Sequence, residues 1–308
     1  MVAGCALSTR DRTLVAPTVR PMSRTAPPYG TAWSASLRRG SEAELRQWLD
    51  FALACADSAD PLAMRSFGHE QEVAAKPDGS FVTATDRAIE ELVRGRIADR
   101  FPGHGAHGEE FGLENDAADV RWYIDPIDGT HNFMRGIPLF GFLLAVERDG
   151  ELQAGVMSAP ALGQRWYAAR GLGAWSVSHM PNAVPKRLKV SAVDRIADAQ
   201  ILFRSVNDMH DSRVAAGYDS LIREVWRERG FGDFWGYALV ADGAAEAMME
   251  QGLGPWDLAA PWVVVEEAGG AVTDFEGRRS LAAGEGLATN GVIHGAIMDR
   301  LWGGPGSG

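Results

Sequence analysis

The chain has few cysteines, no long apolar run and no excess of positive charge. Only two of its 308 residues are cysteines, Cys5 and Cys55, so neither a disulfide framework nor a thiolate metal site is supported. No uninterrupted apolar stretch approaches the roughly 20 residues of a membrane-spanning helix. The formal net charge of −11 argues against a nucleic-acid footprint. We therefore expect no membrane and no nucleic-acid partner, and a reducing cytoplasm fits the scarcity of cysteine.

The composition predicts a globular protein with an atypical N-terminal segment. At 46% hydrophobic residues, the chain can bury a sizeable core as one large domain or two closely joined ones. Residues 1–40 contain six arginines and one acid, Asp11, and are predicted to be a disordered extension. Two interpretations stay open for it: a dispensable extension with a start at Met22, or an organelle transit peptide. Residues 305–308 are predicted to be a flexible tail.

Periodic patterns predict a mixed α and β fold in two halves. Ser41 and Glu44 have capping-box spacing before a helix that is predicted to reach Ala59. A strand or second helical segment is expected after it, then a turn at Asp78 and Gly79, a short β-prone run, and a helix that starts near Asp86. Asp149 and Gly150 predict a β-hairpin. We assign residues 41–180 to an N-terminal α+β half that carries most metal ligands.

The second half, residues 181–304, is predicted to be an α/β region that carries Asp257. Its expected elements are strands at 188–190 and 199–203, a helix over 215–229, a helix and a strand that ends at Glu250, and a last helix after Trp256. Pro261 is placed in the first turn of that last helix, where a missing N–H costs little. Gly269 and Gly270 are expected to end it.

The stretch from Trp122 to Pro138, WYIDPIDGTHNFMRGIP, is the clearest candidate for chemistry. An apolar run delivers Asp125 and Asp128 into a turn broken by Pro126 and Gly129, where a hard cation can bind. The N–H groups of 130–132 follow and suit an anion. Metal and phosphate are therefore expected side by side.

Further acids lie where a regular element meets a loop. Each has a structural explanation: Asp86 and Asp257 as helix caps, Glu109 and Glu110 as solvated loop charges. Taken together, Glu109, Asp257 and the pair in the central stretch are oxygen ligands without accompanying His or Cys clusters. That set predicts magnesium rather than zinc.

Four segments resemble the signature segments of the inositol monophosphatase superfamily of magnesium-dependent phosphatases. They are KPDGSFVTATD (76–86), GEEFG (108–112), WYIDPIDGTHNF (122–133) and WDLAAPWVVVEEAGG (256–270), and the likeness extends over residues 41–301. Within the superfamily, the segments SAPALGQRWYAARGLGAW (158–175) and RGFGDFWGYALVADGAAE (229–246) resemble the histidinol-phosphate phosphatase branch. The resemblance implies a layered αβαβα sandwich, a homodimer and a small-molecule phosphate ester as substrate.

The resemblance also implies roles for single residues. Catalysis would use Glu109 and Thr130 to orient the attacking water, with Asp86 close to Thr130. Gly129 and Thr130 would bind phosphate, and Lys76 would lie on a mobile loop over the metals. His131 departs from the family pattern, in which Thr or Lys is expected, and is predicted to neighbour the site. The implied metal ligands are Glu109, Asp125, the Ile127 carbonyl, Asp128 and Asp257, for two or three Mg²⁺ ions.

The predicted reaction is magnesium-dependent hydrolysis of L-histidinol phosphate in histidine biosynthesis. The resemblance implies that Asp233 and Glu250, with Asp128, bind the substrate, and acids beyond the phosphate favour an amine or imidazolium. As surface caps or ion-pair partners, Asp233 and Glu250 would have no such role. Two alternatives stay open: a phosphatase of inositol phosphate or a related alcohol phosphate, and a non-catalytic metal-binding regulatory protein of this fold.

Overall fold

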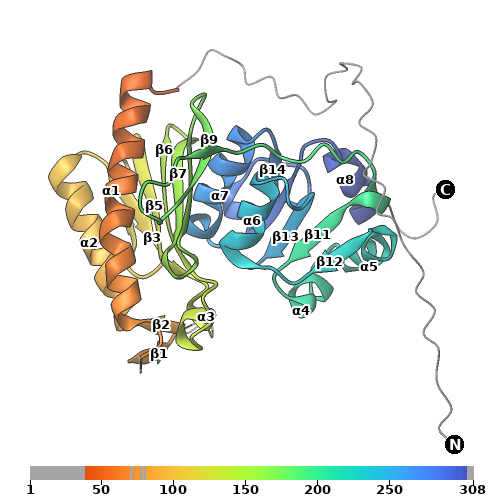
Figure 1. Ribbon diagram of the computed structural model, residues 1–308, viewed down its shortest axis with the longest axis horizontal. Helices are drawn as coiled ribbons and strands as arrows, with labels where there is room; N and C mark the ends of the chain where they lie inside the picture. Colours follow the sequence, from red (N-terminus) through yellow and green to blue (C-terminus); the bar gives the residue numbers. More distant parts are fainter. Residues whose placement is uncertain (1–38, 70–71, 77–78, 80, 304–308) are drawn as a thin grey trace, which may run out of the picture. The chain divides into compact units, whose positions relative to one another are not determined.

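The structure is a computed structural model that describes residues 39–69, 72–76, 79 and 81–303. Most of the predicted N-terminal extension, the C-terminal tail and Asp78 of the predicted turn lie outside these residues. Helices and sheets succeed one another as five layers in the order helix, sheet, helix, sheet, helix (Figure 1). The predicted layered αβαβα sandwich is confirmed.

The larger sheet has eight strands in the described residues, in the order β10-β9-β8-β7-β6-β5-β3-β4. Neighbouring strands are antiparallel except β3 and β5, which run parallel. Asp149 and Gly150 join β6 to β7 with positive φ angles of 51° and 83°, so the predicted hairpin is confirmed. The strands are β3 (Gly105–Gly108), β4 (Gly112–Glu114), β5 (Val120–Asp128), β6 (Gly141–Arg148), β7 (Glu151–Ala159), β8 (Gln164–Ala169), β9 (Gly173–Ser178) and β10 (Lys186–Arg187).

Two helices, α1 (Glu42–Ser66) and α2 (Ala84–Arg100), cover the outer face of this sheet (Figure 1). The predicted capping box of Ser41 and Glu44 is present. The helix it starts does not end near Ala59, because the buried side chains of its apolar face continue to Ala63 and hold it through Pro61. The residues after Ala59 therefore continue the same helix to Ser66, and the expected strand follows only at β1 (Val73–Ala75). Trp48 of α1 and Trp122 of β5 both belong to this part of the core.

The middle layer is formed by α6 (Asp233–Ala241) and α7 (Pro255–Glu267), which lie between the two large sheets (Figure 1). Their apolar side chains share one core with both sheets. Pro255 is the first residue of α7, so Pro261 lies well inside the helix and not in its first turn as predicted. Since proline has no N–H, the carbonyl of Asp257 four residues earlier receives no helical hydrogen bond from it.

The second sheet has five strands in the order β12-β11-β13-β15-β14, again counted over the described residues. Its other face is covered by α5 and α8, which pack into a separate core with it. The bounds are β11 (Gln200–Phe203), α4 (Val206–His210), α5 (Ala215–Glu224), β12 (Arg227–Arg229), β13 (Ala247–Gln251), β14 (Ala271–Thr273), β15 (Glu285–Thr289) and α8 (His294–Trp302), with 3₁₀ turns at Pro160–Leu162, Ile196–Asp198 and Leu281–Ala283.

Two predictions for the second half are wrong at their boundaries. The helix predicted over 215–229 ends at Glu224, because residues 227–229 pair with β11 as an edge strand. The strand predicted at 188–190 is replaced by the short β10, whose Lys186 and Arg187 pair with β9. In both cases sheet pairing, which the local sequence does not report, outweighs the local pattern.

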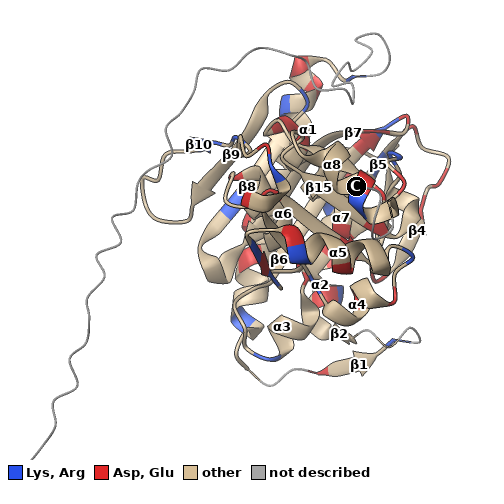
Figure 2. Cartoon of the chain, turned by 90° about the vertical axis from the view of Figure 1, so that its right-hand side faces the viewer, with Lys and Arg blue, Asp and Glu red and all other residues tan. Residues whose placement is uncertain are grey.

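A small hairpin and a short helix lie together at one end of the first sheet. The hairpin consists of β1 (Val73–Ala75) and β2 (Phe81–Thr83), and the helix is α3 (Thr130–Met134). Figures 1 and 2 show β1, β2 and α3 side by side in both views, and Figure 2 shows acidic and basic residues mixed over the surrounding helices and loops. The predicted central stretch thus includes the short helix beside this hairpin (Figures 1 and 2).

Candidate metal and phosphoryl-transfer site

A β-bulge brings Asp125 and Asp128 to one side of β5. Residues three apart on a regular strand point to opposite faces. Opposite β6, however, Asp125 pairs with Leu143 and Asp128 pairs with Gly141, so three steps on β5 match two on its neighbour. The extra residue restores the same side for both carboxylates. Pro126 falls inside the bulge, where its missing N–H breaks no ladder bond.

Glu109 reaches the same place because β3 and β5 run parallel. Gly108 pairs with Ile124, so the residues that follow both strands emerge at the same edge of the sheet. The Glu109 N–H donates to the Ile124 carbonyl over 3.1 Å. Glu109 of the GEEFG segment therefore lies next to Asp125, as the resemblance implied.

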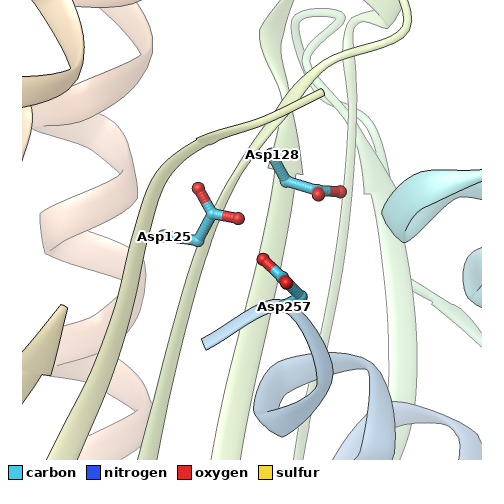
Figure 3. A group of neighbouring side chains, drawn as sticks. All are labelled: Asp125, Asp128 and Asp257. Carbon is cyan, nitrogen blue, oxygen red and sulfur yellow. The ribbon is translucent and has the colours of Figure 1, made fainter. Parts of the chain in front are cut away.

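Asp257 comes from the start of α7. Its Oδ2 accepts the Gly254 N–H over 2.7 Å, which makes it a helix cap as well as a member of the cluster. Figure 3 shows the carboxylates of Asp125 and Asp257 turned toward each other, with Asp128 beside them at the end of β5. Asp257 therefore caps α7 and also belongs to the group of aspartates, so its two interpretations do not exclude each other.

The three aspartates form a group that can hold a metal ion. One carboxylate oxygen from each lies within 4.8 Å of the others. Burial, and then the charges of Glu109, Asp128 and Asp257, raise the pKa of Asp125 well above its ordinary value. Burial and then Glu109 raise the pKa of Asp257 to about 7. Such crowding disfavours three bare carboxylates, and a divalent cation relieves it. The donor set fits a hard cation that prefers oxygen.

The cluster lies in a cavity of about 760 Å³. Seven carboxylates line it, which gives it a strongly acidic character. The predicted site residues that line it are Glu109, Asp125, Ile127, Asp128, Gly129, Thr130, Asp233, Glu250 and Asp257. His131 lines it too, and its ring packs edge-on against Phe81 of β2 with 5.2 Å between the ring centres.

The turn after Asp128 needs glycine. Gly129 has φ of 82°, and a Cβ there would lie 2.9 Å from the Leu139 carbonyl oxygen. The turn places the Thr130 hydroxyl so that it donates to the Ile127 carbonyl over 3.0 Å. The hydroxyl and the carbonyl that the resemblance assigned to water and metal are therefore in contact.

Asp86 and Lys76 lie beside the cavity and not among its lining residues. Asp86 accepts both the N–H and the hydroxyl of Thr83, over 2.8 and 2.5 Å, so its role as the predicted helix cap is clear. Burial raises its pKa to about 6. Lys76 donates to Glu109 over 2.8 Å and to Glu110 over 2.6 Å. Against the effect of burial, these two bonds raise the pKa of Lys76.

Arg204 is a cavity residue that the sequence reading missed. Its guanidinium lies 3.3 Å from Glu250 and donates to Asp208 over 2.8 Å. The part of the cavity that was predicted to carry only acids therefore also contains a cation. The Glu250 side chain is only 2% exposed, which excludes the surface cap, whereas its pairing with Arg204 is the ion-pair role that was the other alternative. Asp233 accepts a bond from Asn132 over 3.3 Å. In the sequence, Arg204 stands out only because it directly follows the strand predicted at 199–203. Many residues follow a strand, so this position alone does not identify a cavity residue.

Comparison with known proteins identifies the family. A model of the inositol monophosphatase family matches residues 44–304. The chain belongs to the inositol monophosphatase family. It is 42% identical to a histidinol-phosphatase of Mycobacterium tuberculosis, over 82% of this chain and 97% of the relative, and 39% identical to one of Streptomyces coelicolor, over 82% and 96%. The solved structure of a Thermotoga maritima IMPase aligns with a TM-score of 0.73 at 30% identity, over 83% of this chain and 96% of that one.

These findings confirm the predicted family and with it the predicted class of enzyme, a phosphatase. Among the described residues, none of the helices is long and apolar enough to cross a membrane.

Proposed function

We propose that this inositol monophosphatase family member hydrolyses L-histidinol phosphate to L-histidinol and inorganic phosphate, as a step of histidine biosynthesis. The observation that carries the proposal is the group of Asp125, Asp128 and Asp257, buried or half-buried, which lies in a cavity with further acids beyond it. The two histidinol-phosphatase relatives, similar over nearly their whole lengths, support the choice of substrate.

Magnesium is the proposed cofactor, because carboxylate and carbonyl oxygens are its preferred protein ligands. Glu109, Asp125 and the Ile127 carbonyl would hold one ion, and Asp125 with Asp128 and Asp257 would hold a second; a third near Glu109 is part of the proposal. When bound, magnesium supplies the charge that acidifies the attacking water and offsets the negative charge on the phosphoryl and leaving oxygens.

The residues of the chain would position the reacting groups. Glu109 would accept a proton from the attacking water while the Thr130 hydroxyl, fixed by its bond to the Ile127 carbonyl, orients that water. Gly129 and Thr130 would contact the phosphate. Asp86 would support Thr130 from the start of α2. Lys76, which donates to Glu109 and Glu110, would release Glu109 when magnesium binds.

Asp128, Asp233 and Glu250 would bind the part of the substrate beyond the phosphate. Histidinol carries an ammonium and an imidazole, and both suit a wall of carboxylates. Arg204 adds a requirement: it offsets the charge of Glu250, so Asp233 would contribute most of the attraction for the ammonium. A second phosphate would be repelled by this wall.

Hydrolysis of inositol 1-phosphate or a related alcohol phosphate is the second candidate. The structural similarity to an IMPase of Thermotoga maritima favours it. Its substrate is neutral beyond the phosphate, so it would gain less from the acids around Asp233. A non-catalytic metal-binding regulatory role is the third candidate and would leave the water-orienting residues without a use.

A homodimer, a cytoplasmic location and the division into halves at residues 41–180 and 181–304 also remain proposals. Organelle import through residues 1–40 remains the alternative to the cytoplasm.

Phosphate release with and without magnesium tests the proposed function. Histidinol phosphate, inositol 1-phosphate, fructose 1,6-bisphosphate and 3′-phosphoadenosine 5′-phosphate would be compared at equal concentration. We expect histidinol phosphate to be hydrolysed fastest and only with magnesium. Inositol 1-phosphate hydrolysed ten times faster than histidinol phosphate would establish the second candidate, and no release from any substrate would establish the third.

A further inference from the structure

Glu90 of α2 is a buried carboxylate beneath the turn that carries Glu109. Its side chain is 0% exposed. Its Oε2 accepts the Glu110 N–H over 2.7 Å, and its Oε1 accepts the Phe111 N–H over 3.2 Å. The carboxylate therefore fixes the backbone immediately after Glu109, although Glu90 itself is not among the residues that line the cavity.

Gly108 provides the space for this contact. A Cβ at Gly108 would lie 2.0 Å from Glu90 Oε1 and 2.7 Å from Oε2. Real Cβ atoms do not approach oxygen so closely, so the carboxylate rests directly against the glycine backbone. The glycine before Glu109 is thus explained by the carboxylate next to it, and not by a positive φ angle.

Arg94 completes the support from the next turn of α2. Its Nε donates to Glu90 Oε1 over 2.8 Å, and its guanidinium also donates to the Gly112 carbonyl and to Glu114. The buried negative charge of Glu90 is therefore paired, and both ends of the turn from Gly108 to Gly112 are tied to α2.

Glu109 is held on both sides as a result. Its own N–H donates to Ile124 of β5, and the next two N–H groups donate to Glu90. We propose that Glu90 is a positioning residue for Glu109: the carboxylate on α2 sets where the Glu109 side chain enters the cavity and thereby sets the affinity for the divalent cation. This inference rests on the proposed function, because it takes Glu109 to be a metal ligand.

Glu90→Gln tests the inference with little change in size. The amide keeps one acceptor, but its NH₂ group faces a backbone N–H and loses that bond. We expect magnesium to bind about tenfold more weakly, as is typical when a group that supports a metal ligand is altered. Isothermal titration calorimetry with magnesium and no substrate measures this. Glu91→Gln, the same change at the exposed neighbouring position, should bind as the wild type does.

Gly108→Ala is the second variant, because its Cβ displaces the same carboxylate without altering Glu90. It should weaken magnesium binding similarly, and the double variant should be no weaker than the worse single one, since both changes act through one contact. Circular dichroism and the unfolding midpoint would show that each sample is folded. If both single variants fail to fold, the role of Glu90 is stability alone and the inference is overturned.

Glu109→Gln separates failure of the inference from failure of the proposed function. If wild type binds no magnesium, or Glu109→Gln binds it as tightly, the proposed metal site is wrong. If Glu109→Gln weakens binding while folded Glu90→Gln and Gly108→Ala bind normally, the site stands and the positioning role of Glu90 is wrong.

Discussion

The side chains of Asp125 and Asp128 are both nearly shielded from water, which changes how readily they ionise. They are 1% and 9% exposed, respectively. Burial is the first cause of the raised pKa of both, and neighbouring acids add to it. At the scale of the single residue, therefore, burial disfavours the ionised form of each aspartate and a bound cation would favour it.

Asp125→Asn should lower turnover by about a hundredfold or more at saturating magnesium, because it removes charge from a proposed metal ligand that would act in the transition state. Phosphate release from histidinol phosphate measures the effect. Asp119→Asn, at an exposed position, is the matched control and should leave turnover unchanged. Near-normal turnover of Asp125→Asn would remove this aspartate from the mechanism.

Arg204→Gln should raise the KM for histidinol phosphate about tenfold and change kcat less. Burial and Asp233 raise the pKa of Glu250, and Arg204 opposes that rise. Arg204 also opposes the rise in the pKa of Asp233. Without the guanidinium, both carboxylates are harder to ionise and the wall attracts a cationic substrate less; tenfold corresponds to about 1.4 kcal/mol. Arg223→Gln, exposed at the end of α5, is the control. A lower KM would instead mean that Arg204 repels the substrate in the wild type.

At the scale of elements, the ends of helices and strands hold the functional groups. Asp86 and Asp257 each occupy the third position of a helix and accept a backbone N–H from the residue before its first turn. Capping immobilises one oxygen of each and so fixes the direction of the other. The same bond that starts α7 therefore orients a member of the metal-binding group.

Two glycine substitutions should change stability in opposite directions. Gly150 has φ of 83° in the turn between β6 and β7, so Gly150→Ala strains the turn and should lower the free energy of unfolding by about 1 kcal/mol.

Gly95 lies inside α2 with open space around it, so Gly95→Ala should raise the free energy of unfolding by about 0.5–1 kcal/mol. Urea denaturation measures both. A loss of stability in Gly95→Ala would contradict the helical argument.

His294, at the first position of α8, should make stability depend on pH. Its ring contacts Thr273 of β14 and Thr289 of β15, and burial lowers its pKa from 6.5 to about 4. The unfolded chain therefore takes up a proton first as the pH falls. The contribution of the neutral His294 ring to the free energy of unfolding is complete above about pH 6.5. As the pH falls toward 4 this contribution is lost, by about 3 kcal/mol in total.

His294→Gln should accordingly show a smaller loss of unfolding free energy between pH 7 and pH 5 than the wild type. Urea denaturation at a series of pH values measures the difference. His210→Gln, at an exposed histidine, is the control and should keep the wild-type dependence. An unchanged slope in His294→Gln would assign the pH dependence to other groups.

At the scale of the whole molecule, the cavity concentrates negative charge between the two halves of the sequence. Its acids come from β5, α4, α6, β13 and α7 and from the turn that follows β3. Their mutual repulsion opposes the folded state until a cation offsets it. Stability and function are therefore coupled through the metal.

Magnesium should raise the unfolding midpoint of EDTA-treated protein by several degrees, since a ligand at about a hundred times its Kd adds about 2.7 kcal/mol. Asp257→Asn should raise the midpoint of the metal-free protein, because it removes one repelling charge, and should abolish most of the shift. Differential scanning calorimetry with and without magnesium measures both effects. A full magnesium shift in Asp257→Asn would exclude it as a ligand.

Much of the architecture and most of the cavity residues could be predicted from the sequence. Asp125, Asp128 and Asp257 stand beside Pro, Gly or a helix start, signals that local chemistry produces. Arg204 and Glu90 could not be selected in this way. The first is recognisable only by its pairing with Glu250, and the second only by its contact with Gly108, and both contacts join residues far apart in the chain.

The separation of Asp257 from the other ligands also dictates an order of events during synthesis on the ribosome. A growing chain presents Asp125 and Asp128 well over a hundred residues before Asp257 emerges, and the bulge that aligns the first two can form with β6 alone. Asp257 joins the other two aspartates only once α7 has packed between the sheets. The proposed magnesium site is therefore completed late, when nearly the whole fold has formed.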